Sequence, residues 1–526
     1  MQTGMELHLI LSQLTAWATD ATLLCSVVGA VSLAYVLVNL LRLRSVPGPF
    51  IAKFTDLWFS YHVARGNPGL VLLNLHKHHG PLIRIGPNRV SLGDPAGIPV
   101  LYRTSPIQAK GGFYKFGIDF SNPENMSIGN AVDEKLHSTL KRPIAPLFSM
   151  ATTVELEAKL DEKLDVFVEY LMHKGSVDIR SWASYWSIDS LNHVAFSEDL
   201  GYMRNEKDVG DVLAMSKSIS MDMQWFYIVP WLKQLQMVLS RLLAKDMLAN
   251  NPLVPLAVTR VTNRLNAAQQ QQRKKQDKAE PSTAKKQPDF LDRLIQVSQR
   301  HPNIYGLPRL ISSTLLLIFA GSDSTAATMT FILYYLVKNP RVLRKLEAEV
   351  ETARQEGRLT DPPQWVDVSK LNYLSAVIKE SLRLSCIVQH GMDREIAAGG
   401  LDLCGHHLPA GTTVTAWQQT IHYNEQLYGC DSRQFRPERW LEVSPQQRQV
   451  MEHSAIWFGH GKHVCSGQHL SRVNMSKLLA RLVLCFDISD TNPGAELVAI
   501  KISALGFADR EYFLNFKAKG DVKTGS

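Results

Sequence analysis

Cysteine is scarce in this sequence and never occurs at the spacing that holds a structural zinc ion. Among 526 residues there are six cysteines, and no two of them are separated by two residues. Small secreted domains and zinc ribbons depend on closely and regularly spaced cysteines. The sequence therefore argues against a disulfide framework and against a zinc ribbon, and it predicts that the main body works in a reducing compartment.

A large charge of one sign is missing as well. Lysine and arginine number 57 against 49 aspartates and glutamates, and the net charge of +8 is not gathered into one tail. So small an excess argues against dedicated nucleic-acid binding and fits a faintly basic surface that faces an anionic membrane or an acidic protein. A hydrophobic content of 45% also excludes intrinsic disorder and low-complexity fibres.

One long hydrophobic run is present near the N-terminus. Ala21 to Leu41 contains no charged residue, and as a helix it would be about 31 Å long, enough to cross a bilayer core. A cleaved signal peptide would begin with basic residues, whereas the preceding stretch carries Glu6 and Asp20 and no lysine or arginine. We therefore predict an uncleaved transmembrane anchor over 21–41, preceded by a lumenal tail over 1–20.

The residues after this run predict its orientation. Arg42 and Arg44 follow it directly, and the positive-inside rule places such a basic flank on the cytosolic side. Pro47-Gly48-Pro49 then blocks helix continuation, so 42–50 is predicted to be a stiff hinge. Residues 51–526 are predicted to form one domain on the cytosolic side.

Two internal segments have an unusual composition. Residues 266–289 include four consecutive glutamines followed by basic residues, with almost nothing to bury. They are predicted to form an exposed loop between helices, with a basic binding patch as the alternative. The apolar stretch from Met221 to Leu239 is rich in methionine and tryptophan. Three interpretations are open: the stretch packs in the core, it forms a surface that inserts into lipid, or it lines a substrate channel.

A long buried helix is predicted between Pro308 and Pro340. Apolar residues recur there at helical spacing nearly all the way round, over about 45 Å. The centre of the helix reads Ala320-Gly321-Ser322-Asp323-Ser324-Thr325. Glycine lowers the stability of such a helix by about 1 kcal/mol, and a buried carboxylate lowers it more unless the carboxylate is paired with a cation or hydrated. Unfavourable residues gathered at one point of a helix indicate a site.

Shorter motifs follow towards the C-terminus. Leu371 to Leu384 is predicted to be an amphipathic helix, on which Glu380 and Arg383 share a face. Short β-prone runs split by glycines predict a small sheet of hairpins from Ile396 to Thr415. The glycine-rich segment Phe458–Gly467 comes next, and a last helix begins directly behind it.

Cys465 lies in this glycine-rich segment, at the start of the last helix. A helix N-terminus and free backbone N–H groups favour negative charge, so the position is predicted to lower the pKa of the thiol. The neighbouring glycines allow close approach of the backbone to a flat ligand. A thiolate held in this way can ligate haem iron. Cys25 and Cys485 lie in apolar runs, where a buried, inert thiol is expected.

The segment Phe458–Gly467 resembles the haem-binding signature of the cytochromes P450, the haem-thiolate monooxygenases. The other motifs follow in that family's order, and the resemblance covers about residues 42–515. They are the anchor with its Pro-Gly-Pro hinge, the oxygen-activation helix around Ala320–Thr325, Glu380-x-x-Arg383 and Phe435–Trp440. Gly80–Asn88 and Leu147–Met150 are in addition similar to the pisatin-demethylase-like group of fungal members.

The resemblance implies a role for each matching residue. Cys465 would be the axial iron ligand, in a haem-binding loop that includes Phe458, Gly459 and Gly467. Asp323 and Ser324 would relay protons to oxygen, with Thr325 as a neighbour that could substitute for Ser324. Two further sets are implied: a buried ion-pair triad of Glu380, Arg383 and Arg439, and a group that neutralises the two haem propionates, namely His137, Lys141, Arg394 and His463.

Three residues depart from the family's usual choices. His463 stands where arginine is common, which would make its propionate contact shorter and dependent on pH. Ser324 stands in place of threonine and keeps the hydroxyl with a freer rotamer. Lys141 stands in place of arginine and offers a point charge where arginine offers a fork. None of these changes removes a needed group, so the chain is expected to be active.

The resemblance also implies a fold and a function. The fold would be mainly α-helical with a small β region, held at the endoplasmic reticulum membrane by one N-terminal helix in contact with lipid. The protein would be a monooxygenase that uses haem b and O2 to oxidise an apolar secondary metabolite in a fungal natural-product pathway, with no nucleic-acid partner. Electrons would come from NADPH through a separate NADPH–cytochrome reductase, with cytochrome b5 as a further donor. Lys135, Lys462 and Arg472 suit an acidic redox partner.

Two other functions are open at this point. A haem-thiolate isomerase or dehydratase would need neither O2 nor a reductase, although the Asp323–Ser324 pair argues against it. A non-enzymatic haem-binding or sensor protein would leave a large apolar pocket beside the iron without a purpose.

Overall fold

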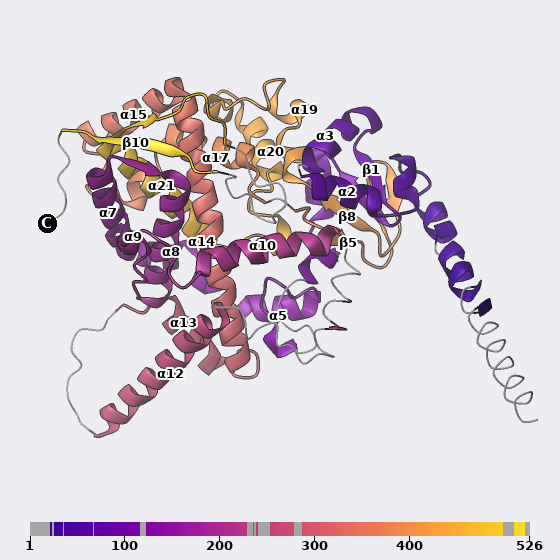
Figure 1. Ribbon diagram of the computed structural model, residues 1–526, viewed down its shortest axis with the longest axis horizontal. Helices are drawn as coiled ribbons and strands as arrows, with labels where there is room; N and C mark the ends of the chain where they lie inside the picture. The colour runs from indigo at the N-terminus through magenta and orange to yellow at the C-terminus, as the bar shows by residue number, and fades with distance from the viewer. Residues whose placement is uncertain are drawn as a thin grey trace, which may run out of the picture.

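Helices make up most of this computed structural model and surround one long central helix, α14 (Figure 1). The structure describes residues 22–23, 26–34, 36–66, 68–115, 123–228, 235, 238–239, 253–277, 287–388, 390–497 and 510–520. The helices are α2 (Leu57–Arg65), α3 (Pro68–His79), α4 (Ile98–Leu101), α5 (Glu134–Ile144), α6 (Met150–Glu155), α7 (Glu157–Lys174), α8 (Ile179–Phe196), α9 (Tyr202–Asn205), α10 (Val212–Ile228), α12 (Leu253–Asp277), α13 (Phe290–Arg300), α14 (Leu307–Lys338), α15 (Pro340–Gln355), α16 (Trp365–Val368), α17 (Asn372–Ser385), α18 (Gln418–His422), α19 (Glu425–Tyr428), α20 (Pro445–Ser454) and α21 (Gln468–Cys485). The strands are β1 (Leu82–Gly86), β2 (Arg89–Leu92), β3 (Ala109–Lys110), β4 (Ser176–Asp178), β5 (Arg394–Glu395), β6 (Leu401–Leu403), β7 (His406–Leu408), β8 (Thr413–Ala416), β9 (Phe486–Asp490) and β10 (Phe513–Ala518).

Helix α14 is the long helix predicted from the apolar run. Gly306 is its N-cap residue, and Pro308 occupies the first turn, where its missing N–H costs nothing. Helix α8 packs along α14, and α12 and α17 also contact it. The surrounding helices bury most of its middle, including the turn that carries Asp323. Residues far apart in the chain therefore meet at the site predicted on this helix.

The strands form small sheets at two ends of the molecule. A five-stranded sheet with the order β1-β2-β8-β5-β3 lies next to the N-terminal helix, and β10 lies at the opposite end between β4 and β9 (Figure 1). Strands β2 and β8 pair in parallel with Arg89 opposite Thr413, so the two halves of the chain share one sheet. β6 and β7 form one of the predicted hairpins. A mainly helical fold with a small β region is confirmed.

The hydrophobic core lies between the helices that surround α14. Its main cluster joins α7, α8, α14, α15, α17 and α21. Trp186, Leu346 and Leu482 are buried there almost completely. Because α17 and α21 both belong to this cluster, the residues at their ends are held by rigid packing. Glu380 and Arg383 lie on α17, and Cys465 directly precedes α21.

The predicted exposed loop over 266–289 is partly helical. Helix α12 continues through the four glutamines to Asp277. Glutamine, arginine and lysine are good helix formers, and the solvent side of a helix needs no apolar residues, so a lack of residues to bury did not require a loop. Asn266 and Gln269 are exposed, as predicted for this segment, whereas Asp289 at its end is buried as the N-cap residue of α13, contrary to the prediction. Residues 278–286, within the same prediction, lie outside the described residues.

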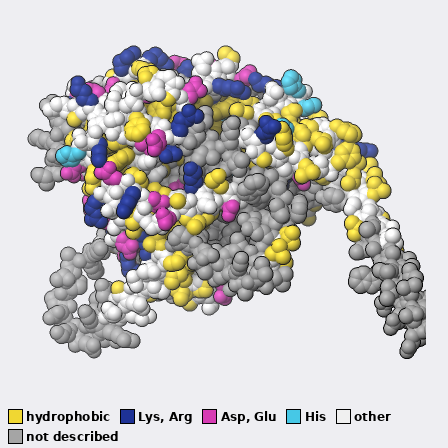
Figure 2. Space-filling model, in the orientation of Figure 1, with side chains coloured by type: hydrophobic (Ala, Val, Ile, Leu, Met, Phe, Trp, Pro, Cys, Tyr) yellow, Lys and Arg dark blue, Asp and Glu magenta, His cyan; other side chains and the backbone are white. Residues whose placement is uncertain are grey.

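The predicted anchor lies partly outside the described residues. A helix over Ser26–Arg42 projects from the body (Figure 1), and Figure 2 shows hydrophobic side chains on its described part and on the adjoining surface. Val31 is 64% exposed and Leu41 is 67% exposed. Among the described helices, the one long and apolar enough to cross a membrane is α14, whose apolar window is 67% buried inside the body. Helix α14 is therefore a core helix.

The hinge after the N-terminal helix packs against the body. Leu43 and Val46 are buried. The Arg84 side chain donates to the Asn39 carbonyl at 2.9 Å, and the Arg84 backbone N–H donates to the Pro47 carbonyl at 2.6 Å. A side chain at Gly48 would clash with the backbone of Arg84, so glycine is required where the two segments meet. These contacts fix the end of the helix relative to β1.

Candidate active site around Cys465

Cys465 lies in a tight loop between α20 and α21. Its backbone N–H donates to the Phe458 carbonyl at 2.7 Å, which closes the glycine-rich segment. A side chain at Gly461, where φ is +65°, would clash with the Tyr102 carbonyl, so this turn requires glycine. A Cβ at Gly467 would lie 3.9 Å from the sulfur of Cys465. The glycines therefore let the loop turn and leave space beside the thiol.

The thiol of Cys465 has a raised pKa, contrary to the prediction from the helix N-terminus. Burial raises the pKa above that of an ordinary thiol, and a hydrogen bond from the Gly467 backbone and the charge of Lys141 lower it only in part. The predicted stabilising groups are present, but desolvation outweighs them. Cys465 also keeps exposed surface although protein surrounds it. Both observations fit a side chain that lines an internal hollow.

Basic side chains gather beside this loop. Lys110, His137 and Arg394 are buried, and Lys141 and His463 are partly buried. Burial and the charge of Arg394 lower the pKa of Lys110 to about 7. Burial and the charge of Lys110 lower the pKa of His137 to about 3. Like charges therefore oppose one another in this basic cluster, and an anionic ligand would relieve the repulsion.

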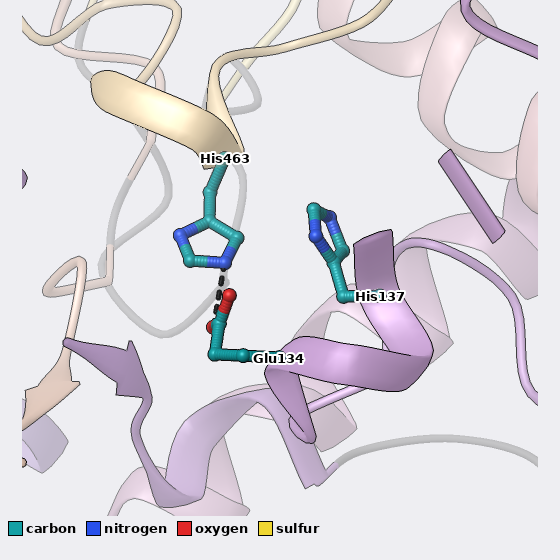
Figure 3. Close-up of side chains that lie close together, drawn as sticks. All are labelled: Glu134, His137 and His463. Atoms are coloured by element: carbon teal, nitrogen blue, oxygen red, sulfur yellow. Dashed lines mark ion pairs between the residues drawn. The ribbon is translucent and has the colours of Figure 1, made fainter. Parts of the chain in front are cut away.

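Glu134 contributes a carboxylate to the basic cluster. Figure 3 shows its ion pair with His463, in which Oε1 lies 2.8 Å from Nε2, and shows His137 beside the pair. The ring centroids of the two histidines are 4.7 Å apart. Lys141 donates to the carbonyl of Lys462 at 2.7 Å. His463 and Lys141 therefore also tie the loop around Cys465 to helix α5.

Glu134, His137 and His463 could in principle hold a metal ion, since their ligand atoms lie within 4.8 Å of one another. The charges around them favour an anion. The lysines and the arginine of the basic cluster lower the pKa of His137 and would repel a cation. Basic side chains bind carboxylates through charge-assisted hydrogen bonds. The described residues therefore fit the two propionates of a haem better than a separate metal ion.

Glu380, Arg383 and Arg439 meet in the interior. Nη2 of Arg383 and Nε of Arg439 each lie 2.8 Å from Oε1 of Glu380, and the side chains of Glu380 and Arg383 have no exposed surface. Trp440 donates to Oε2 at 3.0 Å, and the backbone N–H of Arg436 donates to Oε1 at 3.1 Å. Glu380 thus joins α17 to the 3-10 turn that carries Arg439 and Trp440.

The three residues predicted for proton delivery have different hydrogen-bond partners. The carboxylate of Asp323 is buried and accepts a hydrogen bond from Ser216 on α10. Burial raises its pKa to about 7. Ser324 and Thr325 each donate to the carbonyl four residues earlier, at 2.7 and 2.9 Å. Asp323 and Ser324 are therefore neighbours whose side chains engage different groups, while Ser324 keeps part of its surface exposed.

An aromatic group extends from the basic cluster towards α14. The guanidinium of Arg394 lies 5.7 Å from the ring centroid of Tyr114. His390 stacks on Phe113 with ring centroids 3.9 Å apart, and burial lowers the pKa of His390 to about 4, so the ring is neutral. Phe113 belongs to one apolar cluster with Phe319 of α14. Aromatic and largely apolar side chains therefore connect the basic cluster with α14.

Several residues of the site were not predicted from the sequence. Glu134 precedes His137 by three positions on one helix, and this spacing could have indicated that they share a face. Lys110 lies on a two-residue strand, and no local pattern distinguishes it from a surface lysine. Ser216 is an ordinary serine in an apolar helix. The contacts that make these residues part of the site come from other segments of the chain.

Comparison with known proteins gives consistent similarities. The family model described as Cytochrome P450 matches residues 47–514. The chain is 31% identical over 480 residues to cytochrome P450 monooxygenase mpaDE of Penicillium roqueforti (strain FM164), across 87% of this chain and 54% of that protein. It is 31% identical over 471 residues to a cytochrome P450 monooxygenase of Aspergillus terreus, across 85% of this chain and 91% of that protein. It is 28% identical over 494 residues to cytochrome P450 monooxygenase gsfF of Penicillium aethiopicum, across 91% of this chain and 93% of that protein. The chain thus spans about half the length of the first of these relatives.

Proposed function

This chain belongs to the cytochrome P450 family, and from this membership we propose that it is a membrane-anchored haem-thiolate monooxygenase. The proposed reaction inserts one oxygen atom of O2 into an apolar secondary metabolite of a fungal natural-product pathway. The observation that carries the proposal is Cys465, held in a glycine-rich loop beside a buried cluster of basic side chains. The relatives with the printed name monooxygenase come from fungi, which supports the assignment to a fungal pathway.

The residues around Cys465 would hold the haem. Cys465 would be the axial ligand, Phe458, Gly459 and Gly467 would form its loop, and the basic cluster would bind the propionates. When bound, haem with a thiolate ligand supplies the one-electron and O2 chemistry and favours cleavage of the O–O bond. Metal coordination would also deprotonate the thiol, which opposes the effect of burial on its pKa. The chain itself supplies position, charge balance and an apolar surrounding.

Electrons would reach this site from NADPH through a separate reductase, with cytochrome b5 as a further donor. The sequence contains no dinucleotide-binding motif of the kind GxGxxG followed by an acidic residue that would mark its own NADPH site. Lys462 and Arg472 are exposed in or beside the Cys465 loop, and Lys135 is exposed on α5, the helix that Lys141 ties to this loop. Their charge would attract an acidic redox partner and speed its association.

The N-terminal helix would anchor the body to the endoplasmic reticulum membrane, with the catalytic domain in the cytosol. Its exposed apolar side chains support this proposal, because such a surface is unfavourable in water. Phe50 and Leu57, just after the hinge, are 74% and 66% exposed and continue the apolar surface. Arg42 and Arg44 at the end of the helix fit the cytosolic side.

The function can be tested with a strain that lacks the gene. We expect one metabolite to accumulate and a more oxidised one to disappear. The full-length chain, supplied with the reductase, NADPH and O2, should convert the accumulated compound to the missing one. Conversion that continues without O2 and NADPH would instead identify an isomerase or dehydratase. Tight binding of the compound without any conversion would identify a non-enzymatic haem protein.

Replacing Ser324 by alanine should uncouple the reaction. If Asp323 and Ser324 deliver protons, the hydroxyl is needed for turnover but not for folding, haem binding or substrate binding. Positioned acid–base groups contribute about 10²–10⁴-fold to rate. Ser324→Ala should therefore still oxidise NADPH while releasing peroxide or water, and product per NADPH should fall steeply.

Two variants control this prediction. Ser324→Thr keeps the hydroxyl and narrows its rotamers, so it should restore coupling. Thr325→Ala should do less harm, because Thr325 is buried whereas Ser324 keeps part of its surface exposed. Full coupling in Ser324→Ala together with uncoupling in Thr325→Ala would move the relay to Thr325.

A further inference from the structure

The carboxylate of Asp323 is enclosed on the α10 side of the central helix. Ser216 donates a hydrogen bond to its Oδ2 across 107 positions of sequence. Both side chains belong to buried residues, at 4% and 3% exposure. They line a narrow gap between α8, α10, α12 and α14 that has no room for a water molecule. Apart from these two residues and Ser322, the lining of the gap is apolar.

Among the described residues, Ser216 is the group whose contact favours the charged form of the Asp323 carboxylate. Desolvation raises the pKa of Asp323 to about 7, the Ser216 hydrogen bond lowers it, and the negative charge of Asp208 raises it further. Tyr202 on α9 also interacts electrostatically with Asp323, and its hydroxyl is neutral because burial raises its pKa. The other titratable groups in the surroundings of Tyr202 are Asp189 on α8 and Arg260 on α12, which is paired with Glu198.

We propose that Ser216 is a positioning residue for the proton relay: its hydroxyl holds the Asp323 carboxylate and sets how readily that carboxylate gives up a proton towards Ser324. The proposal rests on the proposed function, in which Asp323 and Ser324 deliver protons. Helix α10 also carries Met223, which packs in one cluster with Phe113 and Phe319. One helix therefore contacts both the relay and the aromatic group near the basic cluster.

The first test measures the Asp323 carboxyl directly, in the resting full-length protein. The infrared C=O band of a protonated carboxyl can be assigned to Asp323 by its absence in Asp323→Asn. In the wild type we expect this band to titrate with a midpoint of about 7. In Ser216→Ala the midpoint should rise by about one to two pH units, because a hydrogen bond to the charged form is lost. Ser216→Thr should titrate like the wild type.

Ser220→Ala is the matched control for folding. Ser220 is also buried on α10, one helical turn after Ser216, and does not line the gap around Asp323. This variant should leave the Asp323 band unchanged. A wild-type midpoint in Ser216→Ala, or an equal shift in Ser220→Ala, would overturn the proposal, because the effect would then not come from the Ser216 hydroxyl.

The second test measures product per NADPH oxidised. Ser216→Ala should lower this ratio several-fold at pH 7. At higher pH the ratio should rise again in part, because the Asp323 carboxyl of this variant is less acidic and loses its proton only at higher pH. Ser216→Thr should restore the wild-type value. An unchanged ratio in Ser216→Ala, in an enzyme that Ser324→Ala does uncouple, would overturn the role of Ser216 and leave the proposed function intact. Absence of turnover in the wild type with every candidate substrate would overturn the proposed function, while the infrared shift would still establish the Ser216 contact.

Discussion

Replacing Glu380 by alanine is expected to leave little folded protein. Glu380 is fully buried and pairs with Arg383 and Arg439, of which Arg439 also pairs with Asp431. Removing one partner of a buried ionic group typically costs about 3–5 kcal/mol, because the remaining charges are stranded in a medium of low polarity. The total free energy of unfolding of a domain is about 5–15 kcal/mol. The loss should therefore appear as a low soluble yield, a lower thermal midpoint and little bound haem.

A chemically matched pair on the surface provides the control. Glu351 and Arg354 are also three residues apart on a helix, with an N–O distance of 2.7 Å, but their side chains are 41% and 51% exposed. Exposed pairs of this kind contribute about 0.3–0.5 kcal/mol. Glu351→Ala should therefore melt almost like the wild type, and the difference between the two variants reports the combined effect of burial and of the further partners of Glu380.

A milder variant keeps the test informative if Glu380→Ala does not fold. Trp440→Phe removes the indole hydrogen bond to Oε2 of Glu380 together with part of a fully buried ring. It should lower stability by about 1–3 kcal/mol, because a buried carboxylate loses one donor. Wild-type melting temperatures in both Glu380→Ala and Trp440→Phe would show that this buried group does not hold α17 to the following turn.

Replacing Cys465 by serine should abolish the thiolate spectrum of the haem protein. Sulfur is a softer and stronger donor to iron than a serine hydroxyl, and the red-shifted absorbance of the reduced CO complex depends on thiolate ligation. The substitution is nearly isosteric, and the loop is held by the backbone bond from Cys465 to Phe458, which serine can also make. We therefore expect a folded chain with normal helical content that lacks this absorbance and all oxygenase activity.

Three other cysteines serve as controls. Cys386 is buried and its thiol donates to the carbonyl of Arg383, Cys404 contacts Asp94, and Cys430 is exposed. None of the three lies in the glycine-rich loop, so serine at each position should leave the CO spectrum unchanged. A normal thiolate spectrum in Cys465→Ser, or its loss in one of the three controls, would place the ligand elsewhere.

Local spacing in the sequence predicted the elements that carry the site. The 32-residue helix α14, the helix with Glu380 and Arg383, and the glycine-rich loop before α21 can each be read from a short window. The reason is that helical periodicity, glycine in tight turns and proline at helix ends act over a few residues. The same rules predicted a loop where α12 is helical, because composition alone does not distinguish an exposed helix from an exposed loop.

Sequence motifs identified part of the site: a cysteine, a carboxylate beside a hydroxyl, and four of its basic side chains. The tertiary structure added Glu134, Lys110 and Ser216, and it fixed how all these groups act on one another. It paired Asp323 with Ser216, Glu134 with His463 and Lys141 with the loop at Lys462, the last across 321 positions. It also raised the pKa of Cys465 where the helix N-terminus alone predicted a lower one. Desolvation and charge–charge interaction depend on every atom within several ångströms, and most of these atoms come from distant segments of the chain.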